Sequence, residues 1–325
     1  MLETLETYST FALYSAMAVY AMAFVFYAID LANRSGDTSV ARQGGGTAAG
    51  VKAAAKAASA DGPAAAAGNA AADAAAADGA VATLTRPAPS AQKSRGAQGG
   101  DPAGRTPARS GRSRALRIGF SLTVLGFLLH LAATVLRGVA AERVPFANMY
   151  EFALTATLSI VLIFLLVQFF VDLRFLGALI TGLTVLFLGI AKINFYVAIV
   201  PIPPALDSYW LVIHILVAVL AVGFLTLSFG LSVLQLMKTR YEGRIAAGEQ
   251  SGLRFLRSFP DVIRLEDLAY RMAIIGFVFW SFTLIAGSIW AERAWSRYWG
   301  WDTKEVWTLV IWVLYAGFIH ARATR

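Results

Sequence analysis

The sequence predicts an all-α fold, a polytopic bundle of about seven transmembrane helices. The 325 residues are 58% hydrophobic with a mean hydropathy of +0.61, and apolar runs of about 18 or more residues recur along the chain. A backbone that crosses a bilayer must satisfy its own hydrogen bonds, so each run is expected to be a helix. The seven expected spans are Tyr8–Ile29, Leu116–Leu136, Tyr150–Val171, Phe175–Val197, Trp210–Met237, Met272–Trp290 and Val306–Ile319.

Three regions follow from the composition. Residues 1–31 form an N-terminal transmembrane helix, and residues 116–325 form a six-helix core. Residues 32–115 between them are rich in Ala and Gly and hold almost no large apolar side chains, so they are expected to be a disordered basic linker. A solvated cytoplasmic connection is favoured for this linker over contact with anionic lipid heads.

The distribution of basic residues predicts the orientation in the cell membrane. With the N-terminus outside, the inner segments hold 22 Lys and Arg residues and the outer segments hold 6. The positive-inside rule favours this arrangement, although the long linker carries less weight than short loops. The distribution of the basic residues matters more here than the net charge of +8. No nucleic-acid partner is expected.

Three histidines, His130, His214 and His320, lie within the apolar spans, where ionisable groups are costly and are candidates for function. His214 lies ~6 Å below Trp210, near the outer surface, where a cofactor could approach. His320 is ~22 Å beyond Glu305 along a straight helix, so it should lie in the inner half. The two histidines therefore indicate two haem positions, or one haem site and an unrelated histidine. A structural role is favoured for His130.

A tryptophan-rich loop, residues 290–305, is the strongest local feature. Flat aromatic faces suit a planar, polarizable ligand, although an aromatic belt at the membrane interface is the alternative. Arg297 and Lys304 could pair with carboxylates of such a ligand. The chain has no cysteine, which excludes covalent haem attachment to this protein and a thiol nucleophile. The aromatic residues are Trp290, Trp295, Tyr298, Trp299 and Trp301.

Four segments resemble one family in the right order. The run W-S-R-Y-W-G-W-D-T-K-E at residues 295–305 resembles the WWD signature of haem-handling membrane proteins, commonly W-G-x-Y-W-x-W-D-P-K-E. The segments A-L-D-S-Y-W-L-V-I-H at 205–214, P-F-A-N-M-Y-E-F at 145–152 and W-V-L-Y-A-G-F-I-H-A-R at 312–322 are similar to further elements of the CcsA/ResC family of system II cytochrome c biogenesis proteins. The WWD loop alone would fit the related CcmC and CcmF proteins equally well, and the segment ending at His214 narrows the choice.

The resemblance implies a function. Such proteins, with a CcsB/ResB-type membrane partner, present non-covalent haem b at the outer face for thioether attachment to C-x-x-C-H of apocytochrome c. It implies that His214 is an axial iron ligand at the outer face and that His320 serves an inner haem. It also assigns haem contacts to Trp295, Trp299, Trp301 and Asp302. A haem chaperone or a haem transporter without synthase activity is the alternative.

The sequence departs from the family pattern in three places. Ser296 replaces the usual Gly and Thr303 replaces the usual Pro, which alters the shape of the loop. The family normally has a further span after His320 that leads to a second outer histidine ligand. The sequence given ends at Arg325, so the core is expected to lack that final span. Either the sequence is truncated, or a partner supplies the second ligand.

Overall fold

The computed structural model describes residues 2–57, 114–203, 207–249 and 253–324. Within these ranges the chain is helical and contains no strand, so the predicted all-α fold class is confirmed. Seven of the described helical segments are long and apolar enough to cross a membrane. The helices are α1 (Leu2–Ala57), α2 (Arg114–Ala140), α3 (Met149–Val167), α4 (Gly177–Asn194), α5 (Tyr209–Ala246), α6 (Val262–Trp295) and α7 (Thr303–Ala323), with 3-10 turns η1 (Arg174–Leu176) and η3 (Arg254–Ser258).

The helix boundaries differ from the expected spans where polar or small residues continue a helix. Helix α1 extends to Ala57, beyond the boundary at residue 31. The rest of the expected linker, 58–113, lies outside the described residues. Helix α6 begins at Val262, ahead of the expected Met272, with Asp261 as its N-cap. Apolar runs locate the spans but not their polar extensions.

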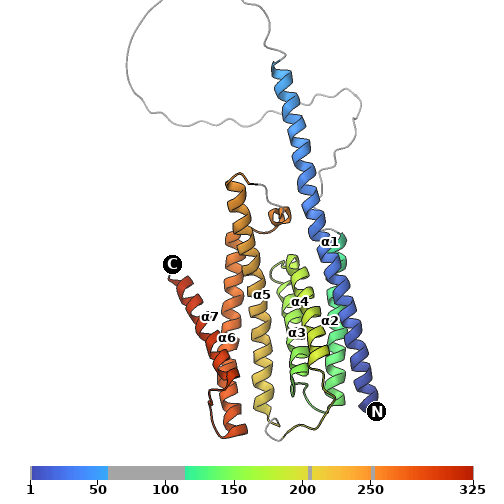
Figure 1. Cartoon of the computed structure of the whole chain (residues 1–325), viewed down its shortest axis with the longest axis vertical. Coiled ribbons are helices and arrows are strands. Elements are labelled where there is room, and N and C mark those ends of the chain that lie inside the picture. Colours follow the sequence, from blue (N-terminus) through green and yellow to red (C-terminus); the bar gives the residue numbers. More distant parts are fainter. Residues whose placement is uncertain (1, 58–113, 204–206, 250–252, 325) are drawn as a thin grey trace, which may run out of the picture. The chain divides into compact units, whose positions relative to one another are not determined.

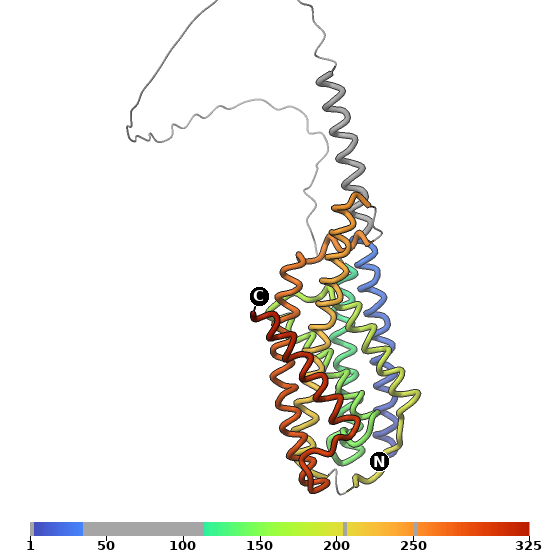
Figure 2. The backbone as a smooth tube through the Cα atoms, turned by 60° about the vertical axis from the view of Figure 1, so that its left-hand side comes forward, coloured from blue at the N-terminus to red at the C-terminus, as the bar shows by residue number. Residues whose placement is uncertain are grey.

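Contacts within the chain define two units, residues 1–41 with 112–325, and residues 42–111. In the first unit, successive helices run in opposite directions (Figure 1, Figure 2). The N-terminus and the α2–α3, α4–α5 and α6–α7 connections therefore lie at one end, called here the N-terminal end. The α3–α4 and α5–α6 connections lie at the opposite end.

The helices differ in how deeply they are packed. Helix α3 is the innermost, with 67% of its most apolar window buried, whereas none of the corresponding window of α7 is buried. Helix α7 contacts α6 through polar groups at several points along its length. These contacts join Trp280 Nε1 to the Thr308 carbonyl (3.1 Å), Trp312 Nε1 to Ser281 Oγ (2.8 Å) and Arg322 to Asp267 (2.9 Å).

Helix α1 packs on the bundle through two buried tyrosines. The Tyr20 ring lies against Gly126, where an added Cβ would come within 2.8 Å of it. The Tyr27 ring lies against Gly119 and Gly177, and a Cβ at Gly177 would come within 2.3 Å of the ring. These glycines are therefore required for the close approach of the rings. Because the tyrosine rings fill the space between the helices, the backbones of α1 and α2 are held apart.

A buried ion cluster joins four segments at the N-terminal end. Arg137 on α2 is 1% exposed and donates to Glu151 on α3 (3.2 Å), to Glu6 on α1 (2.9 Å) and to the Val197 carbonyl (2.7 Å). Arg143 donates to the other carboxylate oxygen of Glu151 at 2.7 Å. Removing one partner of a buried charge pair costs about 3–5 kcal/mol, because the remaining charge is left uncompensated. The cluster therefore fixes the helices against one another.

Two further residues of this end complete the cluster. The Tyr196 hydroxyl donates to Glu6 at 2.9 Å, and the Lys192 ammonium lies 3.4 Å from the centre of the Tyr196 ring. Burial raises the pKa of Tyr196, so its hydroxyl keeps the proton that it donates. Asn148 caps α3 by accepting from the Glu151 backbone N–H at 2.9 Å. The segment at 145–152, expected from the resemblance, thus builds the scaffold at this end.

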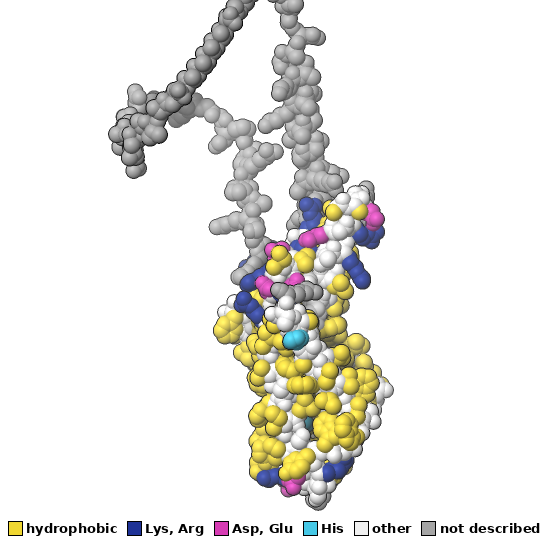
Figure 3. Space-filling model, turned by 90° about the vertical axis from the view of Figure 1, so that its left-hand side faces the viewer, with side chains coloured by type: hydrophobic (Ala, Val, Ile, Leu, Met, Phe, Trp, Pro, Cys, Tyr) yellow, Lys and Arg dark blue, Asp and Glu magenta, His cyan; other side chains and the backbone are white. Residues whose placement is uncertain are grey.

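The surface has the pattern of a membrane protein. In the view of Figure 3, hydrophobic side chains cover the middle of the described face, and charged side chains gather toward its ends. Exposed apolar residues occur on every helix from α1 to α7. Such a band is expected where lipid rather than water surrounds the helices. The protein is therefore a multi-pass membrane protein.

Candidate functional site

A cavity of about 120 Å³ lies near the N-terminal end, between α5, α6, α7 and the loop that joins α6 to α7. Helix α5 contributes one residue to its wall, and the remaining residues come from the hairpin of α6 and α7. The lining residues are His214, Thr283, Leu284, Gly287, Ser288, Trp290, Ala291, Trp295, Tyr298, Trp299, Asp302, Lys304, Glu305 and Thr308. Among the residues expected to form the site, the structure brings His214, Trp295, Trp299, Asp302 and Lys304 together here.

The imidazole of His214 is held in one orientation by α6. Its Nδ1 lies 3.0 Å from the Thr283 carbonyl, and because a carbonyl only accepts, Nδ1 carries the proton. The Nε2 atom then carries the lone pair, and no hydrogen bond from the described residues uses it. The ring packs against Gly287, where an added Cβ would come within 2.8 Å of Cε1. It also stacks on Trp290, with centroids 6.0 Å apart and planes inclined by 13°.

The tryptophans form two edge-to-face pairs around the cavity. The Trp290 and Trp295 rings lie 4.8 Å apart, and the Trp299 and Trp301 rings lie 5.8 Å apart. The Nε1 of Trp299 is buried and has no hydrogen-bond partner among the described residues. A buried donor without an acceptor is costly and requires a reason, such as a ligand that accepts from it. Trp301 is 71% exposed and does not line the cavity.

The loop between α6 and α7 is held in its shape by one carboxylate. Glu305 Oε2 accepts from the backbone N–H of Gly300 at 2.7 Å and of Asp302 at 3.2 Å. Asp302 caps α7 by accepting from the Glu305 N–H at 2.9 Å, which completes a capping box. Ser296 and Trp301 take the left-handed conformation, with φ of 54° and 57°, which is strained for residues with a Cβ. Asp302 thus has a structural part in forming the site.

The two cations expected near a ligand have different positions. Lys304 lines the cavity. The Arg297 guanidinium lies 5.8 Å from the centre of the Trp295 ring and fills the place that a Cβ at Gly300 would take, within 0.7 Å of it. Arg297 does not line the cavity, and a residue larger than glycine at position 300 would displace it.

The other two histidines lie outside the cavity. His320 is exposed on α7 and is ~18 Å beyond the cavity residue Thr308 along that helix. His130 is fully buried and makes an edge contact with Tyr20, with centroids 6.0 Å apart. The Leu154 backbone lies near it, but neither ring nitrogen has a partner in hydrogen-bond geometry among the described residues.

The sequence did not reveal the residues that orient His214, the candidate ligand of the iron. The acceptor for His214 is a backbone carbonyl, at Thr283, and no residue type marks a carbonyl in a sequence. Gly287 had a usable signal, because it lies within the small run Ala286–Ser288 and small residues mark close packing in transmembrane helices. Trp290 was counted with the loop, although the structure places it on α6 as the stacking partner of His214.

Comparison with known sequences shows what the chain is similar to. The profile of a family described as cytochrome C assembly protein matches residues 146–325, more than half of the chain. Cytochrome c biogenesis protein CcsA of Trieres chinensis is 29% identical over 214 residues, which cover 58% of this chain and 69% of that protein. The protein of the same name from Synechococcus sp. (strain CC9902) is 30% identical over 223 residues, covering 63% and 73%. That of Guillardia theta is 26% identical over 221 residues, covering 64% and 73%.

Proposed function

Because the chain belongs to the cytochrome c assembly protein family, as its resemblance to CcsA/ResC proteins predicted, and takes part in cytochrome c biogenesis, we propose that it handles haem directly. In this proposal it binds haem b non-covalently and presents it at the outer membrane face to apocytochrome c. It acts as the haem-presenting subunit of a synthase with a CcsB/ResB-type partner. The thiols of C-x-x-C-H in the substrate then form the thioether bonds.

The orientation of His214 is the observation that carries this proposal. Neutral imidazole is a common axial ligand of haem iron, and a ligating histidine usually donates its other N–H to a fixed acceptor. His214 has that arrangement, since Nδ1 donates to the Thr283 carbonyl (3.0 Å) and Nε2 keeps its lone pair beside the cavity. Thr283 is thus proposed to set the tautomer, and Gly287 to leave room for the ring.

The rest of the cavity fits a planar ligand with acidic groups. Haem supplies iron and two vinyl groups, and the chain supplies aromatic faces at Trp295 and Trp299. Lys304 lies where it can attract a propionate, and the buried Trp299 Nε1 lacks an acceptor. The cavity of about 120 Å³ is smaller than the 300–1,000 Å³ of pockets that enclose drug-sized ligands. Part of a bound haem would therefore remain accessible, as presentation to another protein requires.

The remaining site residues have subsidiary roles in this proposal. Arg297 and Trp301 lie at the outer rim and would contact the exposed part of the haem. His320 would serve a second, deeper haem position, because it lies too far along α7 to reach the iron bound by His214. No protein nucleophile is needed, since the substrate provides both thiols.

Replacing His214 tests the proposal. Purified wild-type protein from haem-replete cells is expected to carry haem that acidified organic solvent extracts, and His214→Ala should retain about tenfold less. His130→Leu serves as a control with its imidazole outside the cavity, and it should retain haem as the wild type does. Colourless wild-type protein would count against haem binding. Haem that is bound but never transferred, in cells with the partner and an apocytochrome, would favour the chaperone over the synthase.

The proposed orientation can be tested with single cysteines, because the chain has none of its own. Ser296 lies in the α6–α7 loop, and Ser258 lies in η3 at the opposite end. An impermeant thiol reagent added to intact cells should label Ser296→Cys and spare Ser258→Cys, with both labelled after the cells are opened. The reverse pattern would place the cavity on the cytoplasmic side and contradict presentation at the outer face.

A further inference from the structure

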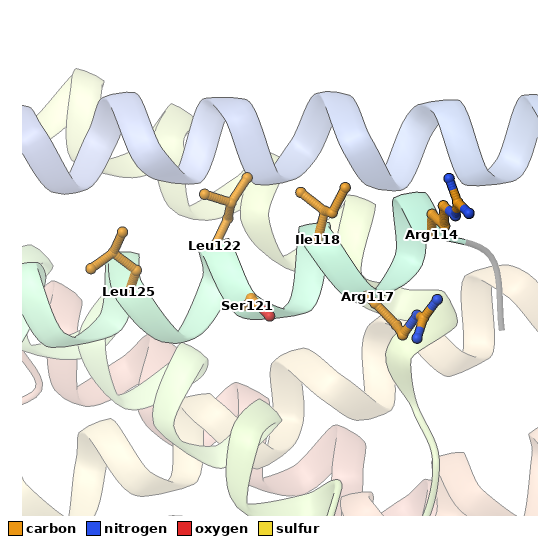
Figure 4. A pocket seen from close by; sticks show the side chains of 6 residues that line it. All are labelled: Arg114, Arg117, Ile118, Ser121, Leu122 and Leu125. Carbon is orange, nitrogen blue, oxygen red and sulfur yellow. The ribbon is translucent and has the colours of Figure 1, made fainter.

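A groove runs along α2 from its first described residue, with some of its lining side chains on the edge of α2 next to α1 and others, Arg117 and Ser121, on the opposite edge (Figure 4). It has a volume of about 500 Å³ and is lined by Arg114, Arg117, Ile118, Ser121, Leu122 and Leu125. These positions recur every three or four residues and so share one stripe of the helix. From Arg114 to Leu125 the stripe is ~16 Å long, about half of the ~30 Å hydrocarbon thickness of a bilayer. The groove therefore has the depth of one lipid leaflet.

The groove exists because α1 packs on a different stripe of α2. The rings of Tyr20 and Tyr27 contact Gly126 and Gly119 of α2 and hold the two backbones apart. The stripe of the groove is left without a covering helix among the described residues, and Ile118 and Leu125 are 43% and 46% exposed. An apolar chain lying there would bury both side chains.

The mouth of the groove is positively charged. Arg114 and Arg117 lie one turn apart, with Arg114 toward α1 and Arg117 on the other side of α2 (Figure 4). Neither guanidinium has an ion-pair partner among the described residues. At this end Arg174 pairs with Asp172 and Arg322 with Asp267, whereas Arg254 and Arg257 of η3, like Arg114 and Arg117, have no ion pair among the described residues. A pair of unneutralised guanidinium groups above an apolar groove complements a molecule with an anionic head and an apolar tail.

We propose that this groove binds one anionic phospholipid of the adjacent leaflet. The phosphate lies at the mouth, within reach of Arg114 and Arg117, and one acyl chain lies along Ile118, Leu122 and Leu125. Guanidinium groups bind phosphate through paired, charge-assisted hydrogen bonds. Basic residues at the membrane surface also favour anionic over zwitterionic lipids. The lipid would lie on the exposed stripe of α2 beside the tyrosine contacts, without any part in the haem cavity.

The test compares two pairs of arginines. Each protein is reconstituted in nanodiscs of equimolar phosphatidylglycerol and phosphatidylcholine, extracted in mild detergent, and its retained lipids are counted by native mass spectrometry. Wild-type protein should retain phosphatidylglycerol in preference, and Arg114→Gln/Arg117→Gln should retain about tenfold less. The control Arg254→Gln/Arg257→Gln removes two exposed arginines of η3 with the same spacing and should retain as much as wild type.

A third variant tests the apolar part of the site. Ile118→Trp fills the groove and keeps both arginines, so it should also lose retained phosphatidylglycerol. Equal losses from the two arginine pairs, or full retention by Ile118→Trp, would overturn the proposal in favour of diffuse charge attraction. Equal retention of the two lipids by the wild type would overturn it as well. Crosslinking of Ser121→Cys to a second protein in membranes, with no lipid retained, would assign the groove to a partner helix instead.

Discussion

The ion cluster on α1 to α4 and the cavity between α5, α6 and α7 differ in how their polar groups are satisfied. On the side of α1 to α4, the charges that enter the interior find partners, as Arg137 does with Glu6 and Glu151. At the cavity, the buried Nε1 of Trp299 has no partner among the described residues. His214 lines the same cavity and uses only its Nδ1, toward the Thr283 carbonyl. The packing differs between single helices, since the apolar window of α3 is 67% buried and that of α7 is not buried at all, with the other helices between 33% and 44%.

This difference separates a scaffold from a site. A buried polar group without a partner costs about 1–3 kcal/mol, and at a cavity a bound ligand recovers that cost. The charges of the ion cluster are paired where four segments must be held together, whereas the Trp299 donor is open at the cavity. Unpartnered polar atoms also occur in the scaffold, on Tyr20, His130 and Ser159. The comparison predicts that changes in the ion cluster act on stability, whereas changes at the cavity act on ligand binding. The following predictions are ordered from the largest expected effect to the smallest.

Replacing Glu151 should have the largest effect. Glu151→Ala leaves Arg137 buried with Glu6 as its remaining carboxylate partner, so the protein should lose about 3 kcal/mol or more of stability. The thermal unfolding midpoint in detergent measures this loss. Asp172→Ala is the matched control, because its pair with Arg174 is 53% exposed on the carboxylate side and such pairs contribute at most about 1 kcal/mol. Similar falls of the unfolding midpoint for the two variants would mean that the ion cluster stabilises the protein no more than an exposed ion pair does.

Adding one methyl group at Gly287 should impair the cavity and spare the scaffold. The new Cβ would come within 2.8 Å of Cε1 and 2.9 Å of Nδ1 of His214, so the imidazole must move from the Thr283 carbonyl. Retained haem should then fall about tenfold, as for other losses of a ligand's orienting contact. Gly317→Ala is the control, because a Cβ there meets nothing within 4 Å. Both variants gain the same helix propensity, so equal haem retention would contradict the proposed ligand.

The sequence predicts the scaffold and the ligand candidate for different physical reasons. Apolar runs fix the spans because the bilayer forces each backbone into a helix, and all seven expected spans correspond to helices. The tryptophan loop and His214 stand out because such residues are costly or rare where they occur. Contacts between segments that are distant in the sequence are not marked by any residue type or pattern. Glu6 with Arg137, and His214 with the Thr283 carbonyl, depend on which helices become neighbours, which periodicity alone does not specify.

The loop residues show a second reason why the sequence does not predict the whole site. The spacing of residues 295–305 indicates that aromatic groups gather there, but it does not say which side chains face inward. The left-handed conformations at Ser296 and Trp301 turn the chain, so Trp299 lines the cavity whereas Trp301 and Arg297 do not. Backbone conformation of this kind depends on the contacts of Glu305 with Gly300 and Asp302, which a sequence does not display.

His130 gives the smallest expected effect and the sharpest test of the comparison, because it lies in the scaffold and yet both ring nitrogens lack partners. If no ligand reaches it, replacing the imidazole with an apolar group of similar size removes an unsatisfied polar group at little packing cost. His130→Leu should therefore leave the unfolding midpoint unchanged or raise it by the equivalent of about 1 kcal/mol, with haem retention as in the wild type. His214→Leu in the same assay should lose haem. A fall in the midpoint for His130→Leu, or a loss of haem, would show that a bound group satisfies His130. The scaffold would then hold a site of its own, and the division between scaffold and site would fail at that residue.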